Sequence, residues 1–281
     1  MAVGLRNEED QVALWNGAAG ATWVEAQEPL DRLFKPFEDL LVESVAAKGA
    51  RHVLDVGCGT GATTLAIARA LGVRGSCVGV DVSEPMLALA RARAERERVP
   101  ANFVLADAQT HAFGAAAFDL IVSRFGVMFF EDSARAFANL RRAALPGGEL
   151  DLIAWRSAAE NPFMTAAERA AAPFLPNIPP RRTDGPGQFA FADSRRVSAT
   201  LERGGWAGVD VRPLDVACSF ARSDLVDYVT RIGPLGRALR STDERTRAEV
   251  TEVVLRAFEP YVRGADVRFD AACWRIGARA A

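Results

Sequence analysis

The sequence has few of the residues that build acid–base, metal and redox sites. Its 281 residues include two histidines, two tyrosines and four cysteines, and its lysines are Lys35 and Lys48. The cysteines form no Cys-x-x-Cys pair and have no histidine at ligand spacing, so we predict no metal site. We expect them to be reduced, small core residues: Cys58, Cys77, Cys218 and Cys273.

The sequence also lacks a concentration of positive charge and any long apolar run. The formal net charge is -2 and the arginines are scattered, so nucleic acid is not an expected partner. No uncharged stretch is long enough to span a bilayer, and the first ten residues lack the apolar core of a secretory signal. We therefore expect a soluble, cytoplasmic protein without a membrane span, and the sequence leaves its oligomeric state open.

What the sequence does contain is an alternation of short apolar strands and amphipathic helices. Helical patterns at about 9–17 and 29–48 precede it. The expected strands are 52–56, 77–80, 102–105, 118–123, 149–155, 209–220 and 266–276, and the expected helices are 62–71, 84–97, 133–144, 194–203, 223–232 and 243–261. Such an alternation predicts an α/β, doubly wound fold, with a parallel sheet covered on both faces.

One segment breaks the alternation. Residues 157–191 contain six prolines among several phenylalanines. A flexible linker would be polar or rich in glycine and serine, whereas these aromatic side chains need a surface that buries them. We therefore predict an ordered apolar insertion.

The most informative motif is the run 53–61, in which an apolar strand containing Asp55 turns through Gly57, Gly59 and Gly61. Glycine permits positive φ and lets the backbone approach a ligand, which is typical of a nucleotide-cofactor site. The run also satisfies the looser dinucleotide fingerprint. However, a carboxylate before the turn disfavours a pyrophosphate and suits a cationic ligand such as S-adenosylmethionine.

This run resembles motif I of the class I S-adenosylmethionine-dependent methyltransferases, and the later strands follow in that family's order. The resemblance implies that Asp81 holds the ribose hydroxyls, because a carboxylate can accept hydrogen bonds from both. It also implies that Asp107 and Ala108 meet the adenine and that Ser123 and Arg124 lie beside the methionine portion. The remaining predicted cofactor contacts are Trp23, Val82 and Met86.

Within the family, the segments 15–17 and 123–130, with Trp23, resemble the small-molecule branch related to ubiquinone and menaquinone biosynthesis methyltransferases. The resemblance implies a Rossmann-like, mostly parallel seven-stranded sheet with an antiparallel last strand, N-terminal helices and an apolar insertion. We expect residues 1–50 to form an N-terminal helical cap and residues 51–281 the methyltransferase domain. Insertions at about 157–192 and 221–262 would then form a substrate lid.

Aromatic residues near the carboxyl ends of the strands and in the insertion are candidates for a substrate pocket, although most of the aromatic side chains are expected in the core. The predicted pocket residues are Trp15, Phe125, Met128, Trp155, Phe163 and Phe189. No catalytic residue is evident. His111 is either a base or an exposed loop histidine, and Arg124 either orients an anionic substrate or holds the cofactor carboxylate or a nearby acid.

These observations predict transfer of a methyl group from S-adenosylmethionine to a small apolar or aromatic metabolite, with S-adenosylhomocysteine as the product. Two alternatives come from other classes of protein. One is a protein that binds S-adenosylmethionine for sensing or assembly without transfer. The other is an NAD-type oxidoreductase, which would need a relay such as Tyr-x-x-x-Lys, and neither Tyr228 nor Tyr261 has a lysine at that spacing.

Overall fold

The computed structural model describes residues 11–178, 181 and 185–281. Its strands form one sheet in the order β3-β2-β1-β4-β5-β8-β6, and the short β7 pairs with β8. They are β1 (His52–Val56), β2 (Ser76–Asp81), β3 (Asn102–Leu105), β4 (Phe118–Arg124), β5 (Ala144–Trp155), β6 (Trp206–Ala221), β7 (Val262–Arg263) and β8 (Asp266–Ala280). On the main path only β8 runs antiparallel to its neighbours, which confirms the predicted fold class. The two-residue β7 is the strand of this sheet that the sequence did not predict.

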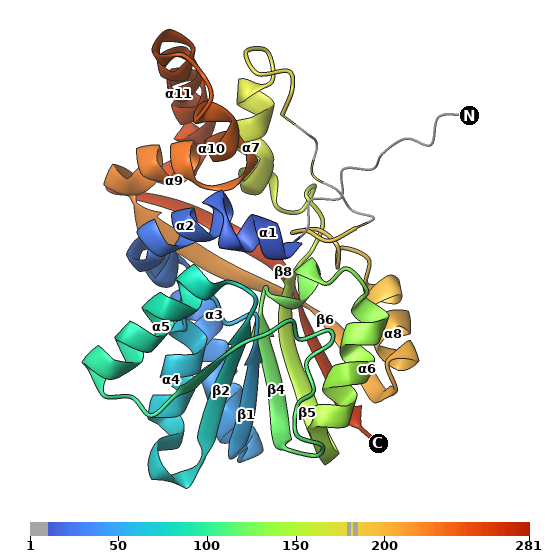
Figure 1. Ribbon diagram of the computed structural model, residues 1–281. Helices are drawn as coiled ribbons and strands as arrows, with labels where there is room; N and C mark the ends of the chain where they lie inside the picture. The colour runs from blue at the N-terminus through green and yellow to red at the C-terminus, as the bar shows by residue number, and fades with distance from the viewer. Residues whose placement is uncertain (1–10, 179–180, 182–184) are drawn as a thin grey trace.

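Helices surround this sheet. They are α1 (Gln11–Asn16), α2 (Ala18–Glu25), α3 (Gln27–Lys48), α4 (Ala62–Leu71), α5 (Glu84–Glu97), α6 (Ser133–Ala143), α7 (Pro162–Ala171), α8 (Ser194–Arg203), α9 (Leu225–Arg231), α10 (Gly233–Leu239) and α11 (Glu244–Phe258). Short 3-10 turns are η1 (Gly72–Arg74), η2 (Val127–Phe129), η3 (Arg222–Asp224) and η4 (Glu259–Tyr261). Figure 1 shows α3, α4 and α5 grouped around β1 and β2, and α6 and α8 beside β5 and β6.

The order of the strands indicates where a ligand-binding crevice lies in this sheet. From β1 the chain moves outward to β2 and β3, then returns to add β4 and β5 on the other side of β1. Right-handed crossovers that move in opposite directions place their helices on opposite faces of the sheet. The point of reversal, between β1 and β4, is where open α/β sheets leave a crevice at the strands' carboxyl ends.

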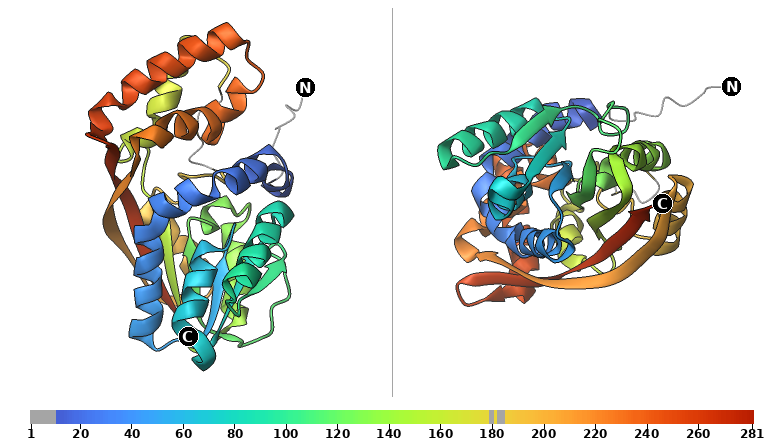
Figure 2. Two further views of the ribbon diagram at one scale, coloured as in Figure 1. Left: turned by 90° about the vertical axis from the view of Figure 1, so that its left-hand side faces the viewer. Right: turned by 90° about the horizontal axis from the view of Figure 1, so that it is seen from below.

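A long hairpin and a group of helices stand above that crevice. Strands β6 and β8 pair from Trp206 and Ala280 to Ala221 and Asp266, well beyond the length of β1. At the far end of this hairpin, α7, α9, α10 and α11 contact one another and form what we call the helical lobe. Figure 2 shows α1 and α2 lying between the lobe and the sheet.

Several local predictions need correction or extension. The helix predicted at 9–17 begins outside the described residues, and α1 ends at Asn16. Helices α2, α7 and α10 were not predicted, because their short apolar patterns contain glycine or proline. Residues 145–148 precede the predicted strand 149–155 but lie inside β5, whose pairing with β4 shifts register between Phe118 and Leu120.

The four cysteines are free and buried, as predicted. No helix in the part of the chain that the structure describes is long and apolar enough to cross a membrane.

Asn161 fastens the insertion to the sheet. Its side chain is fully buried, its Nδ2 donates to the Ala272 carbonyl at 2.9 Å, and its Oδ1 accepts from the Ala272 amide at 2.9 Å. The amide side chain thus pairs with β8 as a neighbouring strand would. Helix α7 starts at the next residue, Pro162, so this pairing sets where the helical lobe begins.

We expect Asn161→Ala to lower the free energy of unfolding by about 2 kcal/mol, because the buried Ala272 amide loses its partner. Urea denaturation measures the change. Asn161→Asp should also destabilise, since a carboxylate can accept from the amide but is repelled by the carbonyl. A loss below about 0.5 kcal/mol in both variants would contradict the role given to this pairing.

Candidate active site

A cavity of about 270 Å³ opens at the carboxyl ends of β1, β2 and β4 and continues to the helical lobe. Its walls come from the N-terminal helices, the strand ends, the lobe and β8. Most of the residues predicted from the motifs line it: Trp15, Trp23, Gly57, Gly59, Asp81, Val82, Met86, Asp107, Ala108, Arg124, Phe125, Met128, Trp155 and Phe163. The fold therefore brings together residues that lie up to 148 positions apart in the sequence, from Trp15 to Phe163.

The glycine turn forms the floor of this cavity. Gly57, Gly59 and Gly61 have φ values of 69°, 55° and 84°, in the region that side chains rarely adopt. A Cβ on Gly57 would lie 2.6 Å from the Cα of Gly126, so the ends of β1 and β4 can approach this closely only with a glycine at each position. The Gly57 amide donates to the Val80 carbonyl at 2.9 Å, which ties the turn to β2.

Asp81 ends β2 and faces the cavity. Its Oδ2 accepts from the Gly59 amide at 2.8 Å and its Oδ1 from the Ser83 amide at 2.9 Å. Burial raises the pKa of Asp81, and these amide bonds oppose the rise. Ser83 caps α5, because its hydroxyl faces the Met86 amide. Asp81 has no cationic partner among the described side chains, which leaves its remaining lone pairs for a neutral donor.

Asp107 follows β3 and lies in the same wall. Its Oδ1 accepts from the Gln109 amide at 2.9 Å. The buried Asn139 of α6 supports this loop, since its Nδ2 donates to the carbonyls of Ala108 at 2.9 Å and His111 at 2.8 Å. His111 itself does not line the cavity, and its ring packs 4.7 Å from that of Phe113.

Asp55 lies beneath the glycine turn and not in the cavity wall. Its side chain accepts a hydrogen bond from Thr64 Oγ1 at 2.6 Å, and the residue is only 1% exposed. Burial raises the pKa of Asp55 from 3.8 to about 6, against the effect of the Thr64 hydroxyl. The carboxylate therefore adds negative charge beneath the turn, but it does not line the cavity.

The raised pKa of Asp55 predicts a specific dependence of stability on pH. Between about pH 4 and 6 the folded state holds a proton that the unfolded state has released, so this carboxyl group's contribution to stability falls as the pH rises. Asp55→Asn should therefore be more stable than the wild type at pH 8, by about 3 kcal/mol, because each unit of pKa shift corresponds to about 1.4 kcal/mol. Urea denaturation at pH 4 and pH 8 measures this, and an equal change at both values would contradict it.

Arg124 ends β4 and faces the cavity next to α3. Its Nη1 donates to the Phe34 carbonyl at 3.3 Å, and its guanidinium lies 5.6 Å from the centre of the Phe34 ring. Burial lowers the pKa of Arg124, and the carboxylates of Asp31, Glu38 and Asp55 oppose that fall. The guanidinium is thus held beside negative charge, and the residue lines the cavity.

Aromatic rings form the wall between the strand ends and the helical lobe. Phe125 has a φ of 66°, a strained value for a residue with a side chain, and its ring stacks on Trp155 at 4.4 Å with an interplanar angle of 5°. Trp155 lies 6.2 Å from Phe163, which stacks on Phe269 of β8 at 3.7 Å. The wall is therefore nearly continuous from the glycine turn to the lobe.

Some predicted residues lie outside the cavity lining. Ser123 donates to the Val56 carbonyl at 2.7 Å and accepts from the Gly126 amide at 3.2 Å, which braces β1 against β4. Gly61 packs against Ala90 and Phe103, and Phe189 is buried with the Arg181 guanidinium 5.9 Å from its ring centre. The lining residues that we did not predict include Leu30, Leu33, Phe34, Phe129, Gln188, Tyr228, Ile232 and Phe269.

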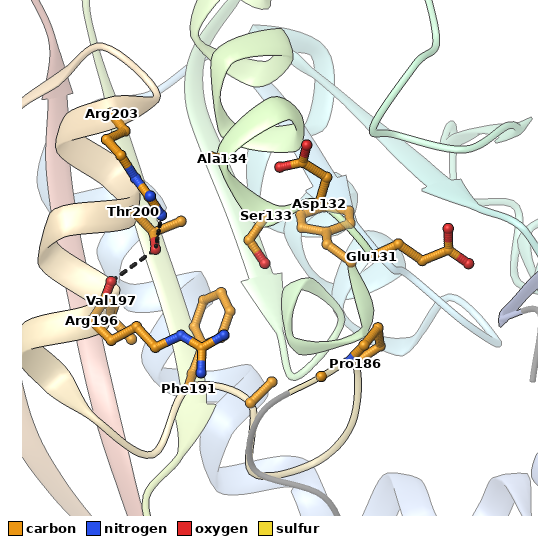
Figure 3. Close-up of a pocket in the computed structure, with 13 residues that line it drawn as sticks. Glu131, Asp132, Ser133, Ala134, Pro186, Phe191, Arg196, Val197, Thr200 and Arg203 are labelled. Atoms are coloured by element: carbon orange, nitrogen blue, oxygen red, sulfur yellow. Dashed lines mark hydrogen bonds between the residues drawn. The ribbon is translucent and has the colours of Figure 1, made fainter. Parts of the chain in front are cut away.

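A second cavity, of about 330 Å³, lies between the start of α6 and α8 (Figure 3). It shares Phe130 and Glu131 with the first cavity. Arg196 and Arg203 of α8 border it, and Figure 3 shows the hydroxyl of Thr200 beside the Arg203 guanidinium, at 3.4 Å. None of the residues predicted from the motifs lines it.

Comparison with known proteins agrees with this geometry. Residues 53–148 match the family model described as a methyltransferase domain. Aklanonic acid methyltransferase DauC of Streptomyces sp. is 32% identical over 67% of this chain and 83% of its own length. Demethylmenaquinone methyltransferase of Thermus thermophilus is 36% identical over 40% of this chain and 50% of its own. This chain spans 43% to 50% of the length of four of the curated relatives that it matches.

Among solved structures, a putative methyltransferase of Bacillus halodurans matches with a TM-score of 0.54 and 19% identity, over 86% of this chain and 97% of the other. The [4+2]-cyclase SpnF matches with a TM-score of 0.53 and 20% identity, over 87% of this chain and 79% of the other. Likeness at such identity establishes the fold alone. The 32% identical relative and the family model show that the chain belongs to the class I S-adenosylmethionine-dependent methyltransferases, in the branch with demethylmenaquinone and other small-molecule methyltransferases.

The cavity fits the cofactor of this family. Two carboxylates, Asp81 and Asp107, stand at the ends of adjacent strands and accept hydrogen bonds only from amide groups of the described residues. Carboxylates of this kind suit the hydroxyl and amine donors of a nucleoside. Gly57 and Gly59 are the residues of the glycine turn that line the cavity, so no side chain of the turn borders it.

Proposed function

We propose that this protein transfers a methyl group from S-adenosylmethionine to a small aromatic or otherwise apolar acceptor by in-line displacement. The supporting observation is that one cavity joins the motif residues at the strand ends to the aromatic wall of the helical lobe. A donor held by the first part and an acceptor held by the second would share this cavity. The helical lobe and the insertion would act as its lid.

On the donor side, Asp81 would hold the ribose hydroxyls, and Asp107 with the Ala108 amide would hold the adenine. When bound, S-adenosylmethionine supplies a methyl group that a sulfonium has already activated.

Asp55 would favour this cation from beneath the turn, so Asp55→Asn should weaken binding of S-adenosylmethionine more than binding of the uncharged thioether S-adenosylhomocysteine. Calorimetry with both ligands measures the difference, and an equal loss for both would exclude the electrostatic role.

On the acceptor side, the chain's contribution would be orientation and the exclusion of water. Holding reactants in line can lower the barrier by about 7 to 11 kcal/mol. No histidine borders the cavity among the residues described, so an acceptor that needs little help from a base, such as a phenolate, suits it best. Relatives are named for nocamycin, demethylmenaquinone and aklanonic acid, which are small molecules.

Release of S-adenosylhomocysteine in the presence of fractionated metabolites tests this proposal. We expect release that depends on a fraction rich in aromatic compounds and that is lost when the fraction is omitted. Binding of S-adenosylmethionine without release in any fraction would contradict methyl transfer and favour a binding protein.

A further inference from the structure

Tyr228 is the one tyrosine that lines the cavity within the described chain. It belongs to α9, in the lobe above the strand ends (Figure 1), and its ring packs 4.8 Å from Phe220 and 6.1 Å from Phe258. Phe220 in turn lies 6.4 Å from Phe269, so Tyr228 stands at the lobe end of the aromatic wall that begins at Phe125.

The hydroxyl of Tyr228 has no hydrogen-bond partner among the residues that the structure describes, although a half-buried phenol in an apolar site usually has one. The neighbouring Arg181 donates twice to Glu168, at 2.7 and 3.2 Å, and its buried Nη1 has no hydrogen-bond partner among the described residues. Burial raises the pKa of Tyr228 to about 12, so at neutral pH this group is a hydrogen-bond donor and not a base. The Tyr228 ring therefore packs against its aromatic neighbours, while its hydroxyl forms no hydrogen bond with the described residues.

We infer that the Tyr228 hydroxyl donates a hydrogen bond to an oxygen at the far end of the acceptor, and that the protein therefore selects flat aromatic acceptors with a second oxygen remote from the methylated atom. The inference rests on the proposed function, because it places the acceptor between the glycine turn and the lobe. Stacked rings along one wall favour a planar molecule, and a single donor at its end selects the molecules that carry an acceptor oxygen there.

Calorimetry on protein saturated with S-adenosylhomocysteine tests this with two probes, 1-naphthol and 1,5-dihydroxynaphthalene. The wild type should bind the diol about fivefold more tightly than the mono-ol, the ratio expected for one net hydrogen bond. Tyr228→Phe should bind both probes equally while its urea midpoint stays unchanged, since the hydroxyl has no partner in the folded chain. Tyr261→Phe is the matched control: that ring packs on Phe258 outside the cavity lining, and the fivefold ratio should persist.

A fivefold ratio that persists in Tyr228→Phe would overturn the inference, and so would failure of both probes to bind the saturated wild type. Neither result would affect the proposed function, which would fail instead if S-adenosylhomocysteine did not bind in the first step.

Discussion

Gly57→Ala is expected to abolish detectable binding of S-adenosylhomocysteine, with an affinity loss of more than 100-fold, or about 3 kcal/mol. Two effects combine in this variant. The φ of 69° costs an alanine about 1 to 2 kcal/mol, and the new Cβ would lie 2.6 Å from the Gly126 backbone. To relieve that contact the ends of β1 and β4 must separate, which moves the floor of the cavity.

Gly49→Ala separates these two effects. Gly49 ends α3 with a φ of 64°, close to that of Gly57, and a Cβ there would meet nothing within 4 Å. This control should lose about 1 kcal/mol of stability and keep its affinity for S-adenosylhomocysteine. Calorimetry and urea denaturation on both variants give the comparison. If Gly57→Ala bound the ligand as well as Gly49→Ala does, the close contact between the two strands would not be needed for the site.

The second large effect is expected for Asp81→Asn, which should weaken binding of S-adenosylmethionine by about 100-fold. The asparagine keeps the size of the side chain but loses the charge and one of two equivalent acceptor oxygens. Hydrogen bonds to a charged group contribute about 1.5 to 3 kcal/mol each, and this carboxylate would make two with the ribose. Calorimetry measures the loss directly.

Asp119→Asn is a matched control for this variant. Asp119 also accepts from two backbone amides, those of Arg51 at 2.8 Å and His52 at 3.0 Å, but it lies at the amino end of β4, away from the cavity. Both variants lose the same kind of amide contact, so both should lose stability, and only Asp81→Asn should lose affinity. Equal affinity losses would mean that Asp81 acts by holding the Gly59 and Ser83 amides and not by holding the ligand.

The sequence predicted the strand-end part of the site because local pattern determines it. The positive φ values of the glycine turn follow from residue chemistry within a few positions. The carboxyl ends of parallel strands lie at one edge of the sheet, which places Asp81 and Asp107 in one crevice.

The lobe end of the site was not predictable in the same way. Tyr228 reaches the cavity only because the β6–β8 hairpin extends far beyond the crevice and carries α9 back over it. Nothing within α9 distinguishes that tyrosine from a core aromatic residue. Asp55 shows the converse: its motif position is clear from the sequence, but its bond to Thr64 beneath the turn depends on how β1 meets α4.

The most direct test of the central claim is the transfer itself. The protein is incubated with trideuteromethyl-labelled S-adenosylmethionine and a metabolite extract, and mass spectrometry searches for compounds that gain the labelled methyl group. We predict at least one aromatic compound that gains the label with the wild type and not with Gly57→Ala. Label that stays entirely on the donor, with a wild-type protein that binds S-adenosylmethionine, would contradict methyl transfer as the function of this site.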